Sequence, residues 1–388
     1  MHKYLFELGH QPHISIAEIQ AVFSHKKIKH KIISAQGGSA SGGKNTFFVV
    51  ENTKELNFED LINTLGGTIK IAEKIKEDNI TDFLSKTPEE FKIQFSLSGP
   101  NSKKIAMAIK KQLKSMGRSV RYIEPKNTAT ILHNKLIKKQ GDLTIFEDEI
   151  YLTKAIQPFE EFGARDYKRP GTDSFSGMLP PKLARIMINL GLDSVQTSHG
   201  APLSDVVLLD PFCGSGTVLT EALDLGFKNI IGSDISEKAI TDTDENIKWI
   251  EKTYNTKPNT LKLTTSDATK LSKELDEDSV DLIVSEPYMG KPLRGNERKD
   301  TLKKQTGELA ELYTQSFREF YQILKEGGTV IFIIPKFKDE NDWVEIDCID
   351  DIKCEGFELI PLSEESDSLT YHRSKQHVAR VIWKFRKV

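Results

Sequence analysis

The fold of this chain follows from the stretch Asp210-Pro211-Phe212-Cys213-Gly214-Ser215-Gly216-Thr217. The apolar run 206–209 precedes this stretch, and a run typical of a helix, 218–223, follows it. A strand, a tight glycine turn and a helix together build a nucleotide-type pocket at the carboxyl end of a parallel sheet. Because Asp210 comes before the glycines, its carboxylate lies at the strand tip, where it suits a cationic ligand with an amino group better than a pyrophosphate. The stretch therefore indicates S-adenosylmethionine as the cofactor.

The composition is typical of a soluble globular protein. The 388 residues are enough for two or three domains, and 38% of them are hydrophobic and 29% charged. No run of about 18 apolar residues occurs, and the first residues lack the apolar core of a signal peptide, so we expect no membrane span and a cytoplasmic protein. Cys213, Cys348 and Cys354 supply neither a disulfide framework nor a four-ligand zinc site, so we expect no metal.

The formal net charge of −3 is unevenly distributed along the chain. Residues 1–150 hold 23 basic and 17 acidic residues, whereas the remainder holds 31 and 40. Basic residues cluster at 25–31, 103–104, 110–121 and 135–139. Any one cluster could be an ordinary solvated helix face, but several in one half favour a module that binds a polyanion.

The first 157 residues predict two α/β units. Over 1–80 we expect strands and helices in the order β-α-β-β-α-β, which is the ferredoxin-like motif, at 4–8, 15–23, 29–33, 47–50, 58–65 and 68–75. Ser15 and Glu18 have the spacing of a capping box, and 35–45 is rich in glycine and serine, like a flexible connection. Over 81–157 we expect strands at 91–97 and 119–123, helices at 102–116 and 129–139, and a hairpin of 143–146 with 150–156.

The remainder predicts a parallel, doubly wound sheet. Residues 158–177 are rich in glycine and proline and are expected to be a linker. From 178 to 388 strands alternate with helices, at 182–189, 206–209, 217–225, 230–233, 237–254, 261–265, 280–284, 308–324 and 329–335. No helix separates 357–361 from 378–385, so these two should pair as an antiparallel edge. This layout is usual for the Rossmann fold of class I methyltransferases.

Acids end three successive strands of this sheet. Asp210 can accept from the amino group of the cofactor, Asp234 from both hydroxyls of a ribose, and Asp267 from the exocyclic amine of adenine. Asp is also common as a helix N-cap, but that role explains a series of three after a glycine turn less well. Gly214 and Gly216 let the backbone approach the methionine moiety. Neighbouring residues complete the candidate cofactor contacts: Pro211, Ile235, Ala268 and Ser285.

A dinucleotide is the main competitor for the cofactor. Its fingerprint, G-x-G-x-x-G, places a third glycine where this chain has Leu219, and Asp210 would face a pyrophosphate.

The fourth strand ends in a turn that suits methylation of an amine on a planar base. Glu286 can accept one N–H of the amine, and a backbone carbonyl held by Pro287 can accept the other, which favours the reactive form of the nitrogen. Tyr288 can stack on the base. The alternative is a turn that merely ends a buried strand. The basic loop 291–299 follows, where a phosphate backbone could lie.

Three segments together resemble the archaeal and eukaryotic tRNA guanosine N2-methyltransferases of the guanosine-10 type. They are 210–217, Ser285-Glu286-Pro287-Tyr288, and the segment from Arg165 to Arg185 with Met178-Leu179-Pro180-Pro181. The opening 4–18 resembles the start of that family's ferredoxin-like domain, and 130–136 resembles a helix of its THUMP domain.

This resemblance implies a ferredoxin-like domain at 1–80, a THUMP domain at 81–157 that grips the acceptor end of tRNA, a linker at 158–177 and a methyltransferase domain at 178–388. It implies N2-methylation of a guanosine in the tRNA core, with Glu286, Pro287 and Tyr288 as catalytic residues. It also implies a small zinc-binding activator subunit, which eukaryotic members need. The family's turn reads Asp-Pro-Pro-Tyr, whereas this chain is one proline short and has a longer acid. Two alternatives therefore stay open: an amine methyltransferase for adenine N6 or cytosine N4 of RNA or DNA, and an inactive RNA-binding homologue.

Overall fold

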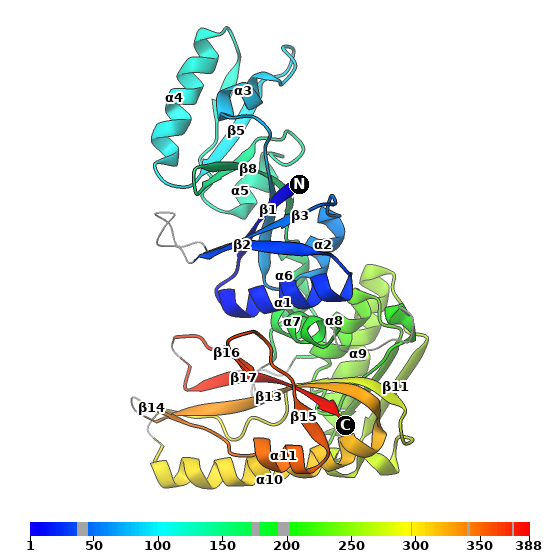
Figure 1. Ribbon diagram of the computed structural model, residues 1–388. Coiled ribbons are helices and arrows are strands. Elements are labelled where there is room, and N and C mark those ends of the chain that lie inside the picture. The colour runs from blue at the N-terminus through cyan, green and yellow to red at the C-terminus, as the bar shows by residue number, and fades with distance from the viewer. Residues whose placement is uncertain (37–45, 173–177, 193–201, 296, 340–341, 375) are drawn as a thin grey trace. The chain divides into compact units, whose positions relative to one another are not determined.

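The chain divides into two compact units. The computed structural model describes residues 1–36, 46–172, 178–192, 202–295, 297–339, 342–374 and 376–388 (Figure 1). The first unit comprises Met1–Ile16 and Lys26–Pro158, and the second comprises Ala17–His25 and Phe159–Val388. Helix α1 is shared between them. Each unit is built on one large sheet.

The sheet of the first unit runs without a break across residue 80, where the sequence predicts a domain boundary. Its eight strands lie in the order β2 (His30–Gln36), β3 (Thr46–Asn52), β1 (His2–Leu8), β4 (Thr68–Lys74), β8 (Glu149–Ile156), β7 (Asp142–Phe146), β5 (Ile93–Ser98) and β6 (Val120–Tyr122). The join is the antiparallel pair of β4 and β8. The predicted hairpin is confirmed, because β7 and β8 pair antiparallel across a short turn.

A buried polar network crosses five neighbouring strands of this sheet. Asp142 of β7 is fully buried and accepts from Ser96 Oγ of β5 at 2.5 Å and from Thr153 Oγ1 of β8 at 2.7 Å. The Nζ atom of Lys70, on β4, lies 3.6 Å from Asp142 and 3.3 Å from Glu7 of β1. The buried charges are thus compensated by each other and by hydroxyl donors, as buried ions require.

Two helices of the first unit differ from the sequence prediction. Helix α1 spans Pro12–His25, so the capping box at Ser15 is wrong: proline occupies the first turn, and Ser15 Oγ donates to the carbonyls of Gln11 and Gly67 at 3.2 and 3.0 Å. Helix α5 covers only Thr128–His133, because Lys135 has a left-handed φ of 56° that ends it. The glycine-rich segment 37–45 lies outside the described residues.

The remaining helices of this unit are α2 (Phe58–Thr64), α4 (Ser102–Ser115) and α3 (Ile80–Ser85), and the sequence did not indicate α3. Helix α4 buries Ala106, Ile109 and Leu113 and turns its lysines outward.

The segment predicted to be a linker contains a helix, α6 (Phe159–Tyr167). Phe162 and Arg165 are buried, and Arg165 Nε lies 2.5 Å from a carboxylate oxygen of Glu221. Helix α6 therefore belongs to the second unit, in which its buried side chains pair with α8, and is not part of a spacer. Residues 173–177 lie outside the described part of the chain.

The sheet of the second unit confirms the doubly wound prediction. Its main path is β11 (Thr260–Thr265), β10 (Asn229–Asp234), β9 (Val207–Asp210), β12 (Val280–Ser285), β13 (Leu324–Asp339), β17 (Val378–Lys387) and β15 (Phe357–Leu359). The first five are parallel, and β17 is antiparallel to both β13 and β15. The antiparallel edge predicted for 357–361 and 378–385 is confirmed. Two short strands outside the prediction, β14 (Asp342–Val344) and β16 (Ser368–Tyr371), pair with β13 and β17.

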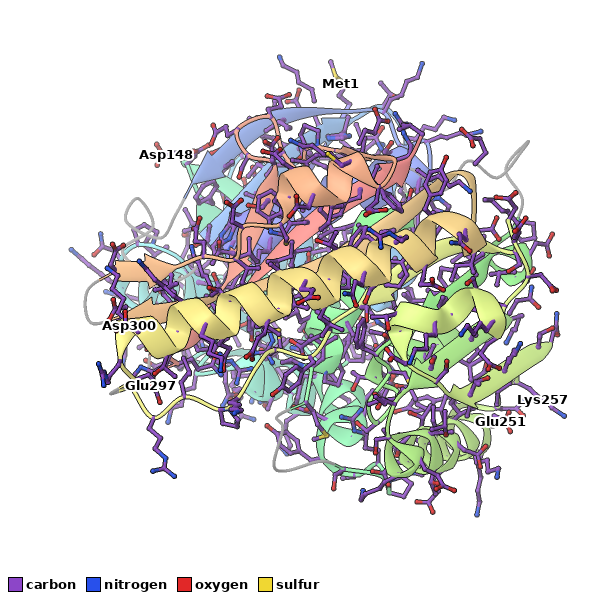
Figure 2. All side chains as sticks on the ribbon, turned by 90° about the horizontal axis from the view of Figure 1, so that it is seen from below. Met1, Asp148, Glu251, Lys257, Glu297 and Asp300 are labelled. Atoms are coloured by element: carbon purple, nitrogen blue, oxygen red, sulfur yellow. The ribbon has the colours of Figure 1, made fainter. Side chains whose placement is uncertain are left out.

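Helices cover both faces of this sheet, as Figure 1 shows. On one face lie α7 (Pro181–Leu192), α8 (Thr217–Leu225) and α9 (Glu237–Tyr254), and on the other lie the 3-10 segment η2 (Ala268–Lys273), α10 (Lys299–Ile323) and α11 (Ile349–Cys354). A short 3-10 segment, η1 (Leu203–Asp205), precedes β9. Helix α10 begins well before the predicted residue 308, because Leu302, Thr306 and Leu309 continue its buried face. Asp300 lies in its first turn (Figure 2).

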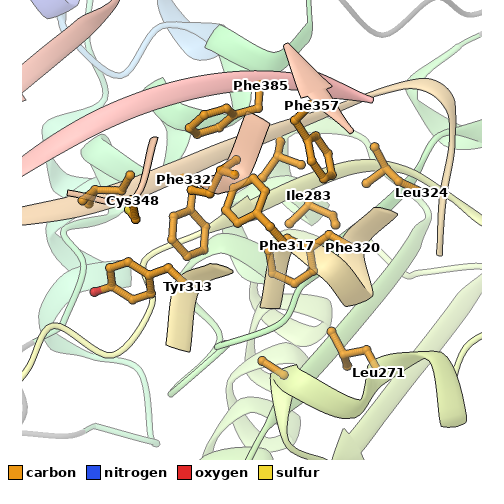
Figure 3. Close-up of a cluster of buried hydrophobic side chains, with 14 of the residues drawn as sticks. Leu271, Ile283, Tyr313, Phe317, Phe320, Leu324, Phe332, Cys348, Phe357 and Phe385 are labelled. Carbon is orange, nitrogen blue, oxygen red and sulfur yellow. The ribbon is translucent and has the colours of Figure 1, made fainter. Parts of the chain in front are cut away.

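An aromatic core fixes α10 to the sheet (Figure 3). The ring of Phe317 lies 5.0–5.2 Å from the rings of Phe320, Phe332, Phe357 and Phe385, measured between centroids. One turn earlier on the helix, the buried Tyr313 donates its hydroxyl to the carbonyl of Tyr288 at 2.7 Å. The core therefore also fixes the turn that follows β12.

Truncation of Phe317 should destabilise the second unit most among single changes on α10. We expect Phe317→Ala to lower the free energy of unfolding by about 3–5 kcal/mol, since it removes a ring at the centre of the cluster. Urea denaturation followed by circular dichroism measures the change. Lys303→Ala, on the exposed face of the same helix, is the control and should stay within about 0.5 kcal/mol of the wild type. Equal losses in the two variants would contradict this view of the core.

Candidate active site

Asp210 is buried at the tip of β9. It is 2% exposed, and its Oδ1 accepts from Ser285 Oγ at 2.7 Å and from the backbone N–H of Phe212 at 3.2 Å. Burial raises the pKa of Asp210 to about 7, and the charges of Asp234 and Glu286 act in the same direction. The site therefore holds a carboxyl group that ionises near neutral pH and would be stabilised as an anion by a cation.

The two glycines of the turn differ in what their missing side chains permit. Gly214 has a φ of +52°, and a Cβ on it would meet no atom within 4 Å, so open space lies beside the turn. Gly216 has a φ of +77°, and a Cβ on it would lie 2.8 Å from Thr243 of α9. A ligand could therefore approach the backbone closely at Gly214, whereas Gly216 is needed for the close packing of α9.

Asp234 connects the tip of β10 to the glycine turn. Its Oδ2 accepts from the backbone N–H of Gly214 at 3.0 Å, and its Oδ1 accepts from that of Ser236 at 2.9 Å. The next side chain, Ile235, is 76% exposed. The Asp234 carboxylate can accept hydrogen bonds from the ribose hydroxyls of a nucleoside, and the exposed Ile235 can contact its flat base.

Asp267 acts as the N-cap of η2 at the tip of β11. Its Oδ1 accepts from the backbone N–H of Thr269 at 3.0 Å and from the hydroxyl of that residue at 2.8 Å, and these bonds lower its pKa. The N-cap interpretation weighed for all three acids therefore describes Asp267, although a carboxylate retains further acceptor sites. Ala268 is buried beside it. The backbone N–H of Ser266 donates to the carbonyl of Asp234, which joins the two strand tips.

The turn after β12 contains an ion pair that the sequence did not reveal. The Glu286 carboxylate lies 2.5 Å from Nε and 3.4 Å from Nη2 of Arg380, on β17. Burial disfavours the charged form of Arg380, but the charge of Glu286 more than offsets this and raises the pKa of Arg380. Pro287 is buried and Tyr288 is 54% exposed. Arg380 could not be found from sequence, because it lies 94 residues from Glu286 and no motif marks it.

The structure thus brings most of the predicted site together at one edge of the sheet. Asp210 contacts Ser285 directly, Asp234 holds the Gly214 turn, and Pro211 is buried between β9 and that turn. Among the residues that the structure describes, no three His, Cys, Asp or Glu side chains are placed to hold a metal. Within the same ranges no helix is long and apolar enough to cross a membrane.

The basic loop before α10 presents its charges to solvent. The exposed cations are Lys291, Arg294, Arg298 and Lys299. The backbone N–H of Arg294 and that of Gly295 donate to the Glu297 carboxylate, which closes a local turn. Asn296 lies outside the described residues.

Two arginines from the segment that carries the family resemblance meet at one buried acid. Arg165 of α6 and Arg185 of α7 both contact the Glu221 carboxylate of α8, at 2.5 and 2.7 Å, and both contact Asp224. Glu221 is fully buried. This network fixes α6 and α7 against the helix that begins at the glycine turn.

Comparison with known proteins identifies the class. Residues 44–245 match the family model described as DNA methylase, of the N6 and N4 type, and residues 172–346 match the RMKL-like methyltransferase domain. The first match spans more than half of the chain, so the chain belongs to the DNA methylase family, and its second unit carries a methyltransferase domain of RMKL-like type. The match to the DNA methylase model ends before β12 and does not include the Glu286 turn.

The names of two curated relatives are more specific about the reaction than the family models are. The chain is 31% identical over 242 residues to the tRNA (guanine(10)-N2)-dimethyltransferase of Methanothermobacter thermautotrophicus, a match that covers 61% of this chain and 59% of that protein. It is 32% identical over 163 residues to the protein of the same name from Methanocaldococcus jannaschii, covering 41% and 38%. The matches therefore span less than two thirds of these relatives. The solved structure of TrmN from Thermus thermophilus aligns over 100% of both chains with a TM-score of 0.52 and 15% identity, which shows a shared fold.

Replacement of Asp210 should change stability in a pH-dependent way. With a folded-state pKa of about 7 against an ordinary 3.8, the folded chain holds a proton that the unfolded chain releases, so this group lowers stability as pH rises from about 4 to 7. Asp210→Asn removes that loss, and its advantage over the wild type should grow with pH, to at most about 4 kcal/mol above pH 7. Thermal unfolding at pH 5 and pH 8 without cofactor measures this.

The exposed Asp300, changed to Asn, is the control and should show no such trend. A difference between Asp210→Asn and the wild type that does not vary with pH would show that Asp210 does not titrate in this range.

The two glycines provide a matched pair of variants. Alanine at either position adopts a left-handed φ, at a cost of about 1–2 kcal/mol. Gly216→Ala also drives a Cβ into Thr243 and should lose a further 1–3 kcal/mol or so. Urea midpoints of the two variants test this, and Thr243→Ser, which removes a methyl group, should restore part of the stability of Gly216→Ala only. Equal midpoints for the two alanine variants would exclude the packing role of Gly216.

Proposed function

We propose that this protein transfers the methyl group of S-adenosylmethionine to N2 of a guanosine in tRNA. The observation that carries the proposal is the position of the Glu286–Pro287–Tyr288 turn, whose strand tip is hydrogen-bonded through Ser285 to Asp210 beside the glycine turn. An amine acceptor site and a cofactor site thus share one edge of the sheet. The names of the two curated relatives support tRNA guanosine as the substrate.

The described residues fit the cofactor. Space is open beside Gly214, and Asp210 can ionise in response to a nearby ammonium group. Asp234 would accept from the ribose hydroxyls, Ile235 would cover a face of adenine, and Asp267 would receive the adenine amine. Pro211, Ala268 and Ser285 would line the pocket between these acids. When bound, S-adenosylmethionine supplies an electrophilic methyl group.

The Glu286–Arg380 pair sets the chemistry available to the acceptor amine. The Glu286 carboxylate is held in place by the Arg380 guanidinium and retains further acceptor sites. Glu286 would therefore orient the amine and accept a hydrogen bond from one N–H at the reaction centre. The carbonyls around Pro287 would accept the second N–H. Tyr288, being half-exposed, can reach a base that has left its stack.

We assign RNA binding to the first unit, with a ferredoxin-like domain over 1–80 and a THUMP domain over 81–157. The strand order β2-β3-β1-β4 around α1 and α2 supports the former. Helix α4 supports RNA binding, because it carries five lysines and no acid and exposes Lys103, Lys104, Lys111 and Lys114. A cytoplasmic location and a zinc-binding activator subunit remain predictions from the sequence and the resemblance.

Mass spectrometry of nucleosides tests the reaction and its base. Bulk tRNA is incubated with the protein and methyl-labelled S-adenosylmethionine and then digested. We expect label in N2-methylated guanosine. Label in N6-methyladenosine or N4-methylcytidine would refute the guanosine proposal and favour the base preference suggested by the DNA methylase match.

In the same assay Glu286→Ala should lower the rate of transfer about 100-fold or more, since it removes the acceptor at the reaction centre. Its dissociation constant for S-adenosylmethionine should change less than about threefold. Glu308→Ala, which removes an exposed acid of α10, is the control and should retain wild-type transfer. Full activity of Glu286→Ala would exclude the proposed role of the turn.

A further inference from the structure

Arg169 follows α6 in the chain, and its buried guanidinium contacts the first residue of α8. It is 5% exposed, and its Nη1 donates to the hydroxyl of Thr217, the first residue of the helix, at 2.6 Å. Nη2 lies 2.8 Å from the sulfur of Met178, which is a weak acceptor. Nε has no hydrogen-bond partner among the described residues, although it is buried.

Arg169 differs in this respect from the other buried arginines nearby. Arg165 and Arg185 are neutralised by Glu221 and Asp224. Within the described ranges no carboxylate lies within 4 Å of Arg169, and burial accordingly lowers its pKa, against the opposing and more distant charges of Asp166 and Glu221. Burial of a charge without a counter-ion is unfavourable, and such a group is expected to meet an anion when the protein functions.

The helix end that Arg169 faces lacks a cap. Gly216 is the N-cap residue of α8, has a left-handed backbone and makes no side-chain capping bond. The first N–H groups of a helix carry partial positive charge and favour an anion. The unpaired guanidinium and the uncapped helix are separate observations, and both meet at Thr217.

The opposite charges at the two ends of the turn 210–217 indicate which kind of anion would fit there. The acid Asp210 lies at one end of the turn 210–217 and Arg169 contacts the other end. A phosphate group would be repelled by Asp210 and Asp234. An α-amino acid, in contrast, carries an ammonium group and a carboxylate on the same carbon, which matches an acid and an arginine at the two ends of one short turn.

We propose that Arg169, together with the N-terminus of α8, binds the carboxylate of the methionine part of the methyl donor. This assignment rests on the proposed function, in which the donor lies on the glycine turn. Asp210 then receives the ammonium group and Arg169 the carboxylate. The planar guanidinium is suited to this role because it can present two parallel N–H donors to a carboxylate.

The test compares two ligands that differ in the amino acid part. S-adenosylhomocysteine contains the carboxylate, whereas 5′-deoxy-5′-methylthioadenosine has the same nucleoside and sulfur and lacks the amino acid. Isothermal titration calorimetry is done on the full chain and on Arg169→Met. We expect Arg169→Met to bind S-adenosylhomocysteine about 10- to 100-fold more weakly, the loss typical of a charge-assisted hydrogen bond. Binding of the methylthio nucleoside should change less than about threefold.

Two further variants complete the test. Arg169→Lys keeps the positive charge but lacks the planar guanidinium, so its affinity should fall about tenfold for S-adenosylhomocysteine only. It also provides a second variant if Arg169→Met does not fold. Arg318→Met removes an exposed arginine of α10 and should bind both ligands like the wild type. Equal losses for the two ligands in the Arg169 variants, or no loss, would refute the carboxylate assignment. Failure of the wild type to bind either ligand would instead refute the proposed function.

Discussion

The hydrogen bond between Ser285 and Asp210 is the contact on which the site depends. It joins the ends of β9 and β12, which are neighbours in the sheet, and it does so at a carboxyl group that is almost completely buried. In the proposed function the cofactor turn begins at Asp210 and the acceptor turn begins at Ser285. The distance between a methyl donor and its acceptor would then be set by two adjacent strands rather than by loops, and rigid positioning of this kind is a major source of rate acceleration.

The local part of this arrangement could be predicted from sequence. The strand before Asp210, the glycine turn and α8 were indicated by an apolar run, glycines and a helical pattern, and α9 was predicted with its observed bounds. The antiparallel end of the sheet was also predicted, because no helical pattern separates its two strands. Patterns failed where tertiary contacts override local signals. Helix α6 was missed because its stability depends on Arg165 and Glu221, and α5 was overextended because a left-handed residue ends it.

The side chains that tune the site were beyond prediction for a related reason. Arg380 reaches Glu286 from the last strand, and Arg169 reaches Thr217 from a segment that the sequence describes only as glycine- and proline-rich. Arg380 belongs to no motif, and the resemblance of the segment 165–185 assigns no role to Arg169. Each arginine has a partner far away in the chain. The acids at the strand tips could be identified because the topology of a parallel sheet places them together. The positions of Arg380 and Arg169 depend instead on how β17 and the segment after α6 cross that edge of the sheet.

The continuous sheet of the first unit has a consequence for how that unit responds to force and heat. Residues between β4 and β8 contribute β5, β6 and β7 to the same sheet, so the segment that carries α4 is inserted between two strands that pair with each other. The network of Lys70, Asp142 and Glu7 crosses this join, with side chains of both parts in one buried cluster. Separation of the two parts would expose that cluster and break a complete strand pair. We therefore expect the proposed ferredoxin-like and THUMP domains to unfold together, because α4, which carries the lysines, packs on β5 and β6 of that same sheet.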